Sequence, residues 1–288
     1  MKKLFLIIIS VFIFNINSYS QCSDGGVCSI GGHIEKETTT PFELSFGYSY
    51  GYSGKDDDIS YSSFKLGGTY NFYENASLHF TIPFNIQSGP LYDTHGIGDL
   101  IFNLRYRFEL DRSRLSVSAG VRLATASENK YYVTQPYKSG LGTNDILFGV
   151  DYSFNNFNVG AGYQIAGKRG EDTEDLLVVE RGDDLLLRAG YFFELEQLSI
   201  NPQLLFIKRL SESSVLVPIS PDAIGVPYYI EVPGSDQSQL NLLVNTTYNV
   251  NENYSHFVEA AIPFLEREVN VDGLKRTFTI STGLSFSF

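Results

Sequence analysis

The stretch Gly98-Asp99-Leu100-Ile101-Phe102-Asn103-Leu104-Arg105-Tyr106-Arg107-Phe108 decides the fold of this chain. From Leu100 onward every second residue is large and apolar, and most of the residues between them are polar or charged. Such alternation is typical of a β-strand with one apolar face and one wet face. Two structures fit it. In a soluble sandwich the aromatic residues would face a core, and in a membrane barrel they would face lipid while the arginines face a polar lumen.

The same alternation returns along nearly the whole chain, which favours one domain. Each segment is close to the 9–11 residues that a tilted strand needs to cross a bilayer. Together with 100–108, these segments are 42–50, 64–72, 78–86, 115–123, 146–154, 157–165, 185–193, 198–206, 240–250, 258–264 and 278–288.

The connections between the segments alternate in length. Short turns are expected at 73–75, 110–112, 155–156, 194–196 and 251–253. Long loops are expected at 53–60, 87–97, 125–143, 167–183, 210–237 and 265–275. Short turns on one side, long loops on the other and an even number of strands are the features of an outer-membrane barrel. Both ends of the barrel segment, 41–288, then lie on the periplasmic side.

Four strands share an internal repeat, in which a polar residue begins the strand and a tyrosine follows seven positions later. The pairs are Asp99/Tyr106, Asp145/Tyr152, Asp184/Tyr191 and Asn241/Tyr248. The odd spacing places the polar residue on the inner face and the tyrosine on the outer face, so the tyrosines form an interfacial girdle at the periplasmic end. Tyr48, Tyr50, Tyr52 and Tyr61 are candidates for its outer counterpart. The prediction is an all-β fold, a twelve-stranded antiparallel transmembrane β-barrel.

The first 40 residues differ from the rest of the chain. Residues 1–20 carry Lys2 and Lys3, a short apolar run and a small-residue cleavage site, which predict a signal peptide. Residues 21–40 are then a periplasmic arm, either a flexible tail or a plug in the lumen. Cys22 and Cys28 in this arm are expected to form a disulfide in an exported protein. A metal site that adds His33 is the alternative, with an incomplete ligand set.

Composition excludes several classes of function. The chain has 33 acidic and 21 basic residues and a formal net charge of −12. Because nucleic-acid phosphates require a basic surface, no nucleic-acid partner is expected. A polybasic membrane-surface binder is disfavoured for the same reason. No cofactor is expected either.

The last strand, 279–288, resembles the C-terminal signature of outer-membrane barrels, an alternating strand closed by phenylalanine, here Phe288. The segment His95-Gly96-Ile97-Gly98-Asp99-Leu100, with echoes at 142–146 and 182–185, resembles the outer-membrane transporters associated with meta-pathway phenol degradation. The resemblance implies passive uptake of small, hydrophobic or amphiphilic molecules. It also implies an outer-membrane location in a Gram-negative bacterium, contact with membrane lipids and lipopolysaccharide, and recognition of the final strand by the barrel-assembly machinery.

Charged residues at inward positions define the candidate site. Asp99, Asp145 and Asp184 are expected at the outer rim, with Arg122 near Asp99 and Arg209 near Asp184. Arg105, Arg107 and Arg188 are expected deeper in the bore. One interpretation is an acidic vestibule over a basic constriction that selects solutes. The favoured alternative is a set of structural ion pairs that satisfy charges inside a narrow barrel.

Two further features bear on transport. Pro83, Pro202 and Pro263 lie inside predicted strands and should mark ends, kinks or bulges, because proline cannot donate to the ladder. In this the chain is similar in kind to long-chain fatty-acid transporters, which use a kinked strand as a lateral exit. The loop at 210–237 contains apolar runs, which predict a lid or a hydrophobic docking surface.

The alternative functions are a lipid-modifying hydrolase of the outer membrane and a structural or adhesion barrel. Hydrolysis needs a serine, a histidine and an orienting partner within hydrogen-bond reach. The four histidines are His33, His79, His95 and His256, and no Ser/His/Asn set converges in the predicted strand phasing. The chain is therefore predicted not to be an enzyme.

Overall fold

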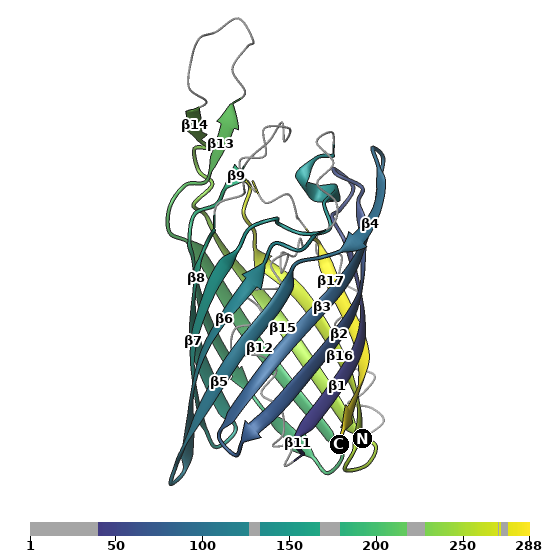
Figure 1. Ribbon diagram of the computed structural model, residues 1–288, viewed down its shortest axis with the longest axis vertical. Helices are drawn as coiled ribbons and strands as arrows, with labels where there is room; N and C mark the ends of the chain where they lie inside the picture. The colour runs from purple at the N-terminus through teal and green to yellow at the C-terminus, as the bar shows by residue number, and fades with distance from the viewer. Residues whose placement is uncertain (1–39, 127–132, 168–178, 218–227, 270, 272–275) are drawn as a thin grey trace, which may run out of the picture.

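A computed structural model describes residues 40–126, 133–167, 179–217, 228–269, 271 and 276–288, which form one closed β-barrel (Figure 1). Twelve antiparallel strands make the wall, and β1 pairs with β17 to close it. The strands β10 and β11 count as one, because both pair with β12 and only Phe192 separates them. In order the wall consists of β1 (Phe42–Tyr52), β2 (Ser60–Tyr73), β3 (Ala76–Ser88), β5 (Leu100–Leu110), β6 (Ser113–Leu123), β7 (Asp145–Phe154), β8 (Phe157–Ile165), β10 (Asp184–Tyr191) with β11 (Phe193–Leu195), β12 (Leu198–Arg209), β15 (Ser238–Asn249), β16 (Tyr254–Leu265) and β17 (Phe278–Ser287). The predicted strand number is confirmed.

The remaining elements lie at the end of the barrel that carries the long loops (Figure 1). Strand β4 (Asp93–Ile97) pairs with the last residues of β3, beyond the start of β5. A short 3-10 helix, η1 (Gln135–Tyr137), lies in the loop between β6 and β7. Strands β9 (Val179–Glu180), β13 (Ser214–Val217) and β14 (Tyr228–Glu231) form a separate three-stranded sheet. Within the described residues, no helix is long and apolar enough to span a membrane.

The two ends of the barrel differ as the loop lengths predicted. The five short turns lie at the end where β1 begins and β17 ends, and the long connections lie at the opposite end (Figure 1). At the short-turn end, the Phe288 N–H donates to the Phe42 carbonyl at 2.8 Å. The short-turn end is called periplasmic below and the long-loop end extracellular, following the construction of outer-membrane barrels.

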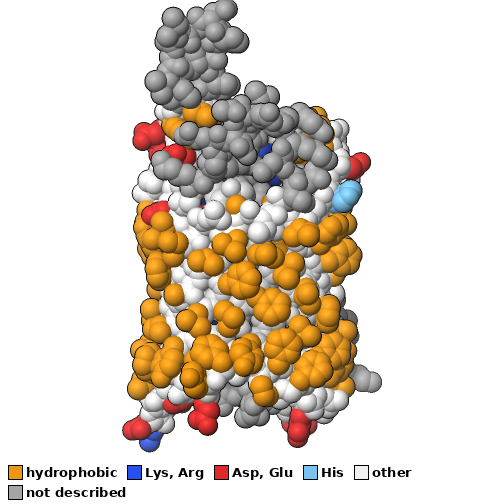
Figure 2. Space-filling view, in the orientation of Figure 1, with side chains coloured by type: hydrophobic (Ala, Val, Ile, Leu, Met, Phe, Trp, Pro, Cys, Tyr) orange, Lys and Arg blue, Asp and Glu red, His pale blue; other side chains and the backbone are white. Residues whose placement is uncertain are grey.

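The alternation that predicted the strands separates two faces of the wall. On β5, Leu104 is 50% exposed and its neighbour Asn103 is 5% exposed. On β7, Phe148 is 45% exposed and Leu147 is 1% exposed. On the face that Figure 2 shows, exposed apolar side chains form a broad band over the barrel wall, and acidic residues lie at the periplasmic turns. The aromatic face of the opening stretch thus faces outward, where lipid lies in a membrane barrel.

The periplasmic aromatic girdle is also present. The Tyr106 and Phe108 rings lie 4.8 Å apart, as do those of Tyr191 and Phe193. The outer counterpart differs from the prediction at one residue, because Tyr61 is only 4% exposed. Phe64 points outward, so the strand period turns Tyr61, three residues earlier, to the inside of the barrel.

The predicted signal peptide (1–20), and residues 21–39 of the arm with Cys22 and Cys28, lie outside the described residues.

Candidate functional site

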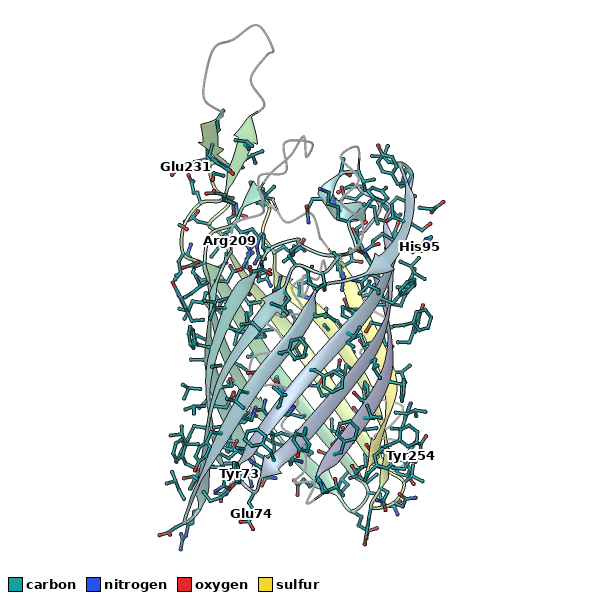
Figure 3. All side chains as sticks on the ribbon, in the orientation of Figure 1. Tyr73, Glu74, His95, Arg209, Glu231 and Tyr254 are labelled. Carbon is teal, nitrogen blue, oxygen red and sulfur yellow. The ribbon has the colours of Figure 1, made fainter. Side chains whose placement is uncertain are left out.

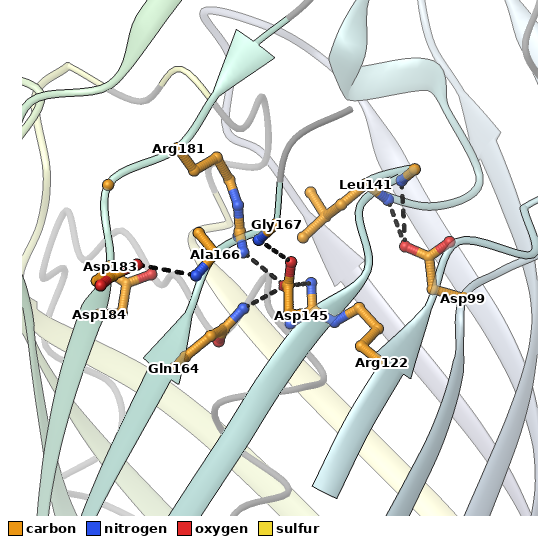
Figure 4. A network of polar contacts seen from close by, with 12 residues as sticks. Asp99, Arg122, Leu141, Asp145, Gln164, Ala166, Gly167, Arg181, Asp183 and Asp184 are labelled. Atoms are coloured by element: carbon orange, nitrogen blue, oxygen red, sulfur yellow. Dashed lines mark hydrogen bonds and ion pairs between the residues drawn. The ribbon is translucent and has the colours of Figure 1, made fainter. Parts of the chain in front are cut away.

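The inner face of the barrel carries the charged residues that the sequence singled out. Asp145 and Asp184 begin β7 and β10 at the extracellular end, and Asp99 immediately precedes β5 there; the three residues are 1%, 1% and 7% exposed. Each carboxylate accepts hydrogen bonds from a neighbouring loop, and Figure 4 shows the contacts of Asp99 and Asp145. The repeated acid therefore has a common structural role, which is to hold a long loop against the rim.

Asp145 is the centre of the densest of these networks. Arg181 Nη2 lies 2.8 Å and Arg122 Nη1 3.4 Å from its carboxylate, and the Gly167 N–H donates to it at 2.9 Å. Gln164 Nε2 adds a fourth contact at 2.5 Å. Gly167 follows β8 and Arg181 precedes β10, so one carboxylate fastens both described ends of the β8–β10 loop.

Asp184 forms the second network, with two arginines. Arg209 donates from Nε at 3.2 Å and from Nη2 at 3.0 Å, and Arg267 Nη2 lies 3.1 Å away. Figure 3 shows Arg209 at the extracellular end of the wall. The expected proximity of Arg209 to Asp184 is present, because the two residues are direct neighbours across β10 and β12.

Asp99 differs from the other two acids because all its hydrogen-bond donors among the described residues are backbone N–H groups. The Leu141 N–H donates at 2.7 Å, and the N–H groups of Gly142 and Ala126 each donate at 3.3 Å. Asp99 lies in the connection between β4 and β5, outside the strands. Burial raises the pKa of its carboxyl, and Arg122 and the backbone donors act in the opposite direction. Gly140 permits the close approach of the loop, since a Cβ there would lie 2.6 Å from Asp99 Oδ1.

Arg122 lies near Asp99, since both line one cavity, but it forms its ion pair with another acid. Its ion pair is with Asp145, which lies directly opposite it across β6 and β7. On the other side, Arg122 faces Ile101 across β5 and β6. The positive charge of Arg122 also acts to lower the pKa of the Asp99 carboxyl.

The three deeper arginines lie at different levels rather than in one ring. Arg188 forms a buried ion pair with Asp151. Arg107 donates to the Glu74 carbonyl at 2.8 Å, in the periplasmic turn between β2 and β3. Arg105 lies between these levels on β5, opposite Ser77 and Ser118. A single constriction built from them stays a prediction.

Pro83 lies beside an irregularity in the β-ladder. It is paired with Lys65 of β2 on one side. On the other side the pairing passes from Phe84↔Ile97 to Thr81↔Ile101, so two residues of β3 oppose three. The Gly98 N–H donates to the Pro83 carbonyl at 2.8 Å across this step. The lateral gate at Pro83 stays a prediction.

The other two prolines also lie next to ladder irregularities. Pro202 pairs with Val244 on one side, and on the other it lies in the gap between the pairs Gly190↔Gln203 and Phe193↔Ile200, where β10 gives way to β11. Pro263 pairs with Asn241, where the register between β15 and β16 shifts.

Sequence reasoning missed the apolar residues that point inward. Leu186, Leu205 and Ile207 form a buried cluster against which Leu243 packs. The ring of Phe257 lies over two glycines of the neighbouring strands, since a Cβ at Gly283 would be 2.3 Å from it and a Cβ at Gly47 would be 3.4 Å from it. The two-residue period of the strands already places these residues on the inner face. The sequence analysis did not name them because it considered only polar residues as lumen residues.

The described histidines do not assemble a hydrolytic site. The two ring nitrogens of His79 lie 2.9 Å from Ser77 Oγ and 2.9 Å from Thr69 Oγ1. The second contact is thus to a hydroxyl, where a hydrolase would place a carboxylate or amide to orient the ring. Nε2 of His256 lies 2.9 Å from Thr282 Oγ1 on an exposed part of the wall.

The described part of the 210–237 loop forms a hairpin. Strands β13 and β14 pair from Ser214↔Glu231 to Val217↔Tyr228, and Figure 1 shows the hairpin rising beyond the extracellular end of the barrel. The tip, which carries part of the predicted apolar runs, is outside the described residues.

The fold and the two faces define the class, a closed antiparallel barrel of the transmembrane type. Comparison with solved structures agrees. The COG4313 outer-membrane channel from Pseudomonas putida F1 aligns with a TM-score of 0.62 and 14% identity, over 89% of this chain and 98% of that one. The CymD monoaromatic hydrocarbon channel aligns with a TM-score of 0.53 and 10% identity, over 86% and 89%. The translocator domain of the autotransporter NalP from Neisseria meningitidis aligns with a TM-score of 0.50 and 10% identity, over 88% and 90%.

A scan against models of protein families found no match, and a search of curated protein sequences found none either. The similar structures include both solute channels and a translocator, so they establish the barrel architecture and leave the cargo to be argued from this chain's own residues.

Proposed function

We propose that the protein is a passive channel for small molecules in the outer membrane of a Gram-negative bacterium. The observation that carries the proposal is the contrast between the two faces of one closed wall, apolar outside and polar inside. An apolar outer band suits lipid, and a polar lumen suits the passage of solutes. Twelve strands lie between the eight whose interior side chains fill and the sixteen that leave an aqueous channel, so we expect a narrow bore.

The lining is asymmetric, which supports a path along one side of the bore. Apart from Glu43 at the periplasmic end, the inward residues of β1 and β17 are small: Ser45, Gly47, Ser49, Gly51, Thr279, Ser281, Gly283, Ser285 and Ser287. The opposite wall carries the long side chains of the Asp145, Asp151 and Asp184 ion pairs. A solute would thus travel beside the small residues, and the ion pairs would keep the other wall rigid.

The resemblance of the last strand extends the proposal to partners. We expect membrane lipids and lipopolysaccharide to contact the outer face, and the barrel-assembly machinery to recognise the strand ending at Phe288. That side chain is 64% exposed at the periplasmic end. The predicted signal peptide, 1–20, would direct export, and the arm, 21–40, would lie in the periplasm or enter the lumen.

Planar-bilayer recording of the purified protein tests the proposal. We expect discrete single-channel steps with a small conductance, and uptake of small solutes into liposomes that contain the protein. A second protein that lacks residues 21–38 distinguishes the two roles of the arm: a plug predicts larger steps, and a tail predicts no change. Liposomes that stay impermeable with both proteins would contradict the channel, and release of fatty acid from phospholipid in the same liposomes would favour the hydrolase instead.

A further inference from the structure

A cavity of about 130 Å³ lies in the extracellular half of the barrel, beneath the loop that contains η1. Inward residues of β1, β2, β3, β5 and β6 form its walls, and residues 138–141 form part of its cover. The cover is well fixed. Gln87 Nε2 donates to the Lys138 carbonyl at 3.1 Å, and Asp99 accepts the Leu141 N–H at 2.7 Å.

The charge of this cavity is opposite to that of the chain. In the part of the chain that the structure describes, Lys65, Arg122, Lys138 and Arg276 line it, and Asp99 is the one acidic residue among the lining residues. Both oxygens of that carboxylate already accept backbone N–H groups, from Ala126, Leu141 and Gly142. In a protein with a formal net charge of −12, four cations around one small space are a local concentration of positive charge.

Three buried polar groups in the lining have no hydrogen-bond partner among the described residues. Two of them are Nη2 of Arg122, whose residue is 3% exposed, and the hydroxyl of Tyr61, whose residue is 4% exposed. Arg276 lies over the Tyr61 ring, with its Cζ 4.9 Å from the ring centroid. Ser63 Oγ, also in the lining, is likewise without a partner in the described part of the chain. Buried polar groups in folded proteins are almost always satisfied, by protein, water or ligand.

We propose that this cavity binds a small organic carboxylate. A carboxylate supplies two oxygens that accept from Arg122 and Tyr61, with the Lys65 ammonium as a further charge-assisted donor. The volume is that of about four liquid waters, which fits an anion of two or three carbon atoms and exceeds what one chloride fills. The inference rests on the proposed channel function in one respect, which is that it names a class of solute for the channel. Binding of that solute can be measured without measuring transport.

Saturation-transfer NMR on the full-length protein in detergent tests the proposal, with acetate as the probe, acetamide as its neutral isostere and a chloride-free buffer. We expect saturable transfer to acetate and none to acetamide. Lys65→Gln should weaken acetate binding by about tenfold or more, the effect of one charge-assisted hydrogen bond. The matched control is Lys55→Gln, in the exposed loop after β1, which should bind as the unmodified protein does.

Tyr61→Phe is the second variant, because it removes only a hydroxyl that has no partner among the described residues and so leaves the fold intact. We expect it to weaken acetate binding several-fold while heat-modifiable gel mobility stays unchanged. Equal transfer to acetate and acetamide, or unchanged acetate affinity in Lys65→Gln, would overturn the proposal and assign the cavity to water alone. Bilayer conductance of the same preparation in potassium chloride tests the channel separately, so either proposal can fail while the other stands.

Discussion

Arg209 contacts the Asp184 carboxylate at two points, from Nε at 3.2 Å and from Nη2 at 3.0 Å, and both side chains are at most 1% exposed. This is the bidentate geometry that matches a guanidinium to a carboxylate. Arg267 joins the same carboxylate from the loop after β16, so the pair connects three parts of the extracellular rim.

Asp184→Ala should therefore lower the free energy of unfolding by about 3–5 kcal/mol, because it leaves buried guanidinium groups uncompensated. Guanidinium chloride titration of the protein in liposomes measures the change. The control is Glu109→Ala, which removes the exposed ion pair with Arg114 near the periplasmic turn and should cost about 0–1 kcal/mol. Equal losses in the two variants would contradict a structural role for the buried network.

Asp99 should control the loop that covers the cavity. In Asp99→Ala, the N–H groups of Leu141, Gly142 and Ala126 lose their acceptor, and hydrogen bonds to a charged group are worth about 1.5–3 kcal/mol each. Lys138, now 4% exposed, should then become a trypsin site. Mass spectrometry should detect cleavage after Lys138 at least about ten times faster than in the unmodified protein.

Asp93→Ala is the matched control for that experiment. Asp93 also lies at the extracellular end, on β4, but it is exposed, and in the described part of the chain its carboxylate accepts a hydrogen bond from Ser88 alone. Cleavage after Lys138 should stay slow in this variant. Fast cleavage in both variants would show that the loop is held by something other than Asp99.

The positions and faces of the strands could be predicted because they depend on local pattern. A period of two fixes which residues share a face, and a turn of two residues, such as that between Leu110 and Ser113, fixes the register of its two strands. The Arg209–Asp184 pair followed from such a turn, that between β11 and β12. The prediction that Tyr61 faces outward is wrong. Phe64 faces outward, and a residue three positions away on a strand lies on the opposite face.

The choice of partner for Arg122 could not be predicted in the same way. Arg122 and Asp145 are opposite each other across β6 and β7, but a loop of about twenty residues separates them along the chain. Over such a length the loop does not fix the register, and only closure of the whole barrel does. The cavity depends on the same long-range arrangement, since its cover, residues 138–141, belongs to that loop.

The lipid-facing assignment of the opening stretch predicts a dependence on depth. Leu104→Arg, in the middle of the outer face of β5, should destabilise the protein in liposomes by about 2–4 kcal/mol. Leu110→Arg, equally exposed at the periplasmic end of the same strand, should cost about 0–1 kcal/mol. Equal costs at the two positions would contradict the placement of this face in a bilayer.

The last prediction concerns Phe257, an aromatic ring that points into the bore. It lies over Gly283 and Gly47, where a Cβ would come within 2.3 Å and 3.4 Å of the ring, and these positions belong to the wall of small residues along which we propose that solutes pass. Phe257→Ala should therefore widen the path and raise the single-channel conductance, because conduction through a narrow bore depends on its radius.

Phe264→Ala supplies the control, because Phe264 lies on the same strand, points outward and is 63% exposed. Its removal should leave the conductance unchanged. Gly283→Ala tests the same packing from the other side, since the added methyl group would force the ring or the Phe46 carbonyl to move and should cost about 1–3 kcal/mol of stability. If Phe257→Ala and Phe264→Ala conduct alike, the ring does not border the path, and solutes must pass along another part of the wall.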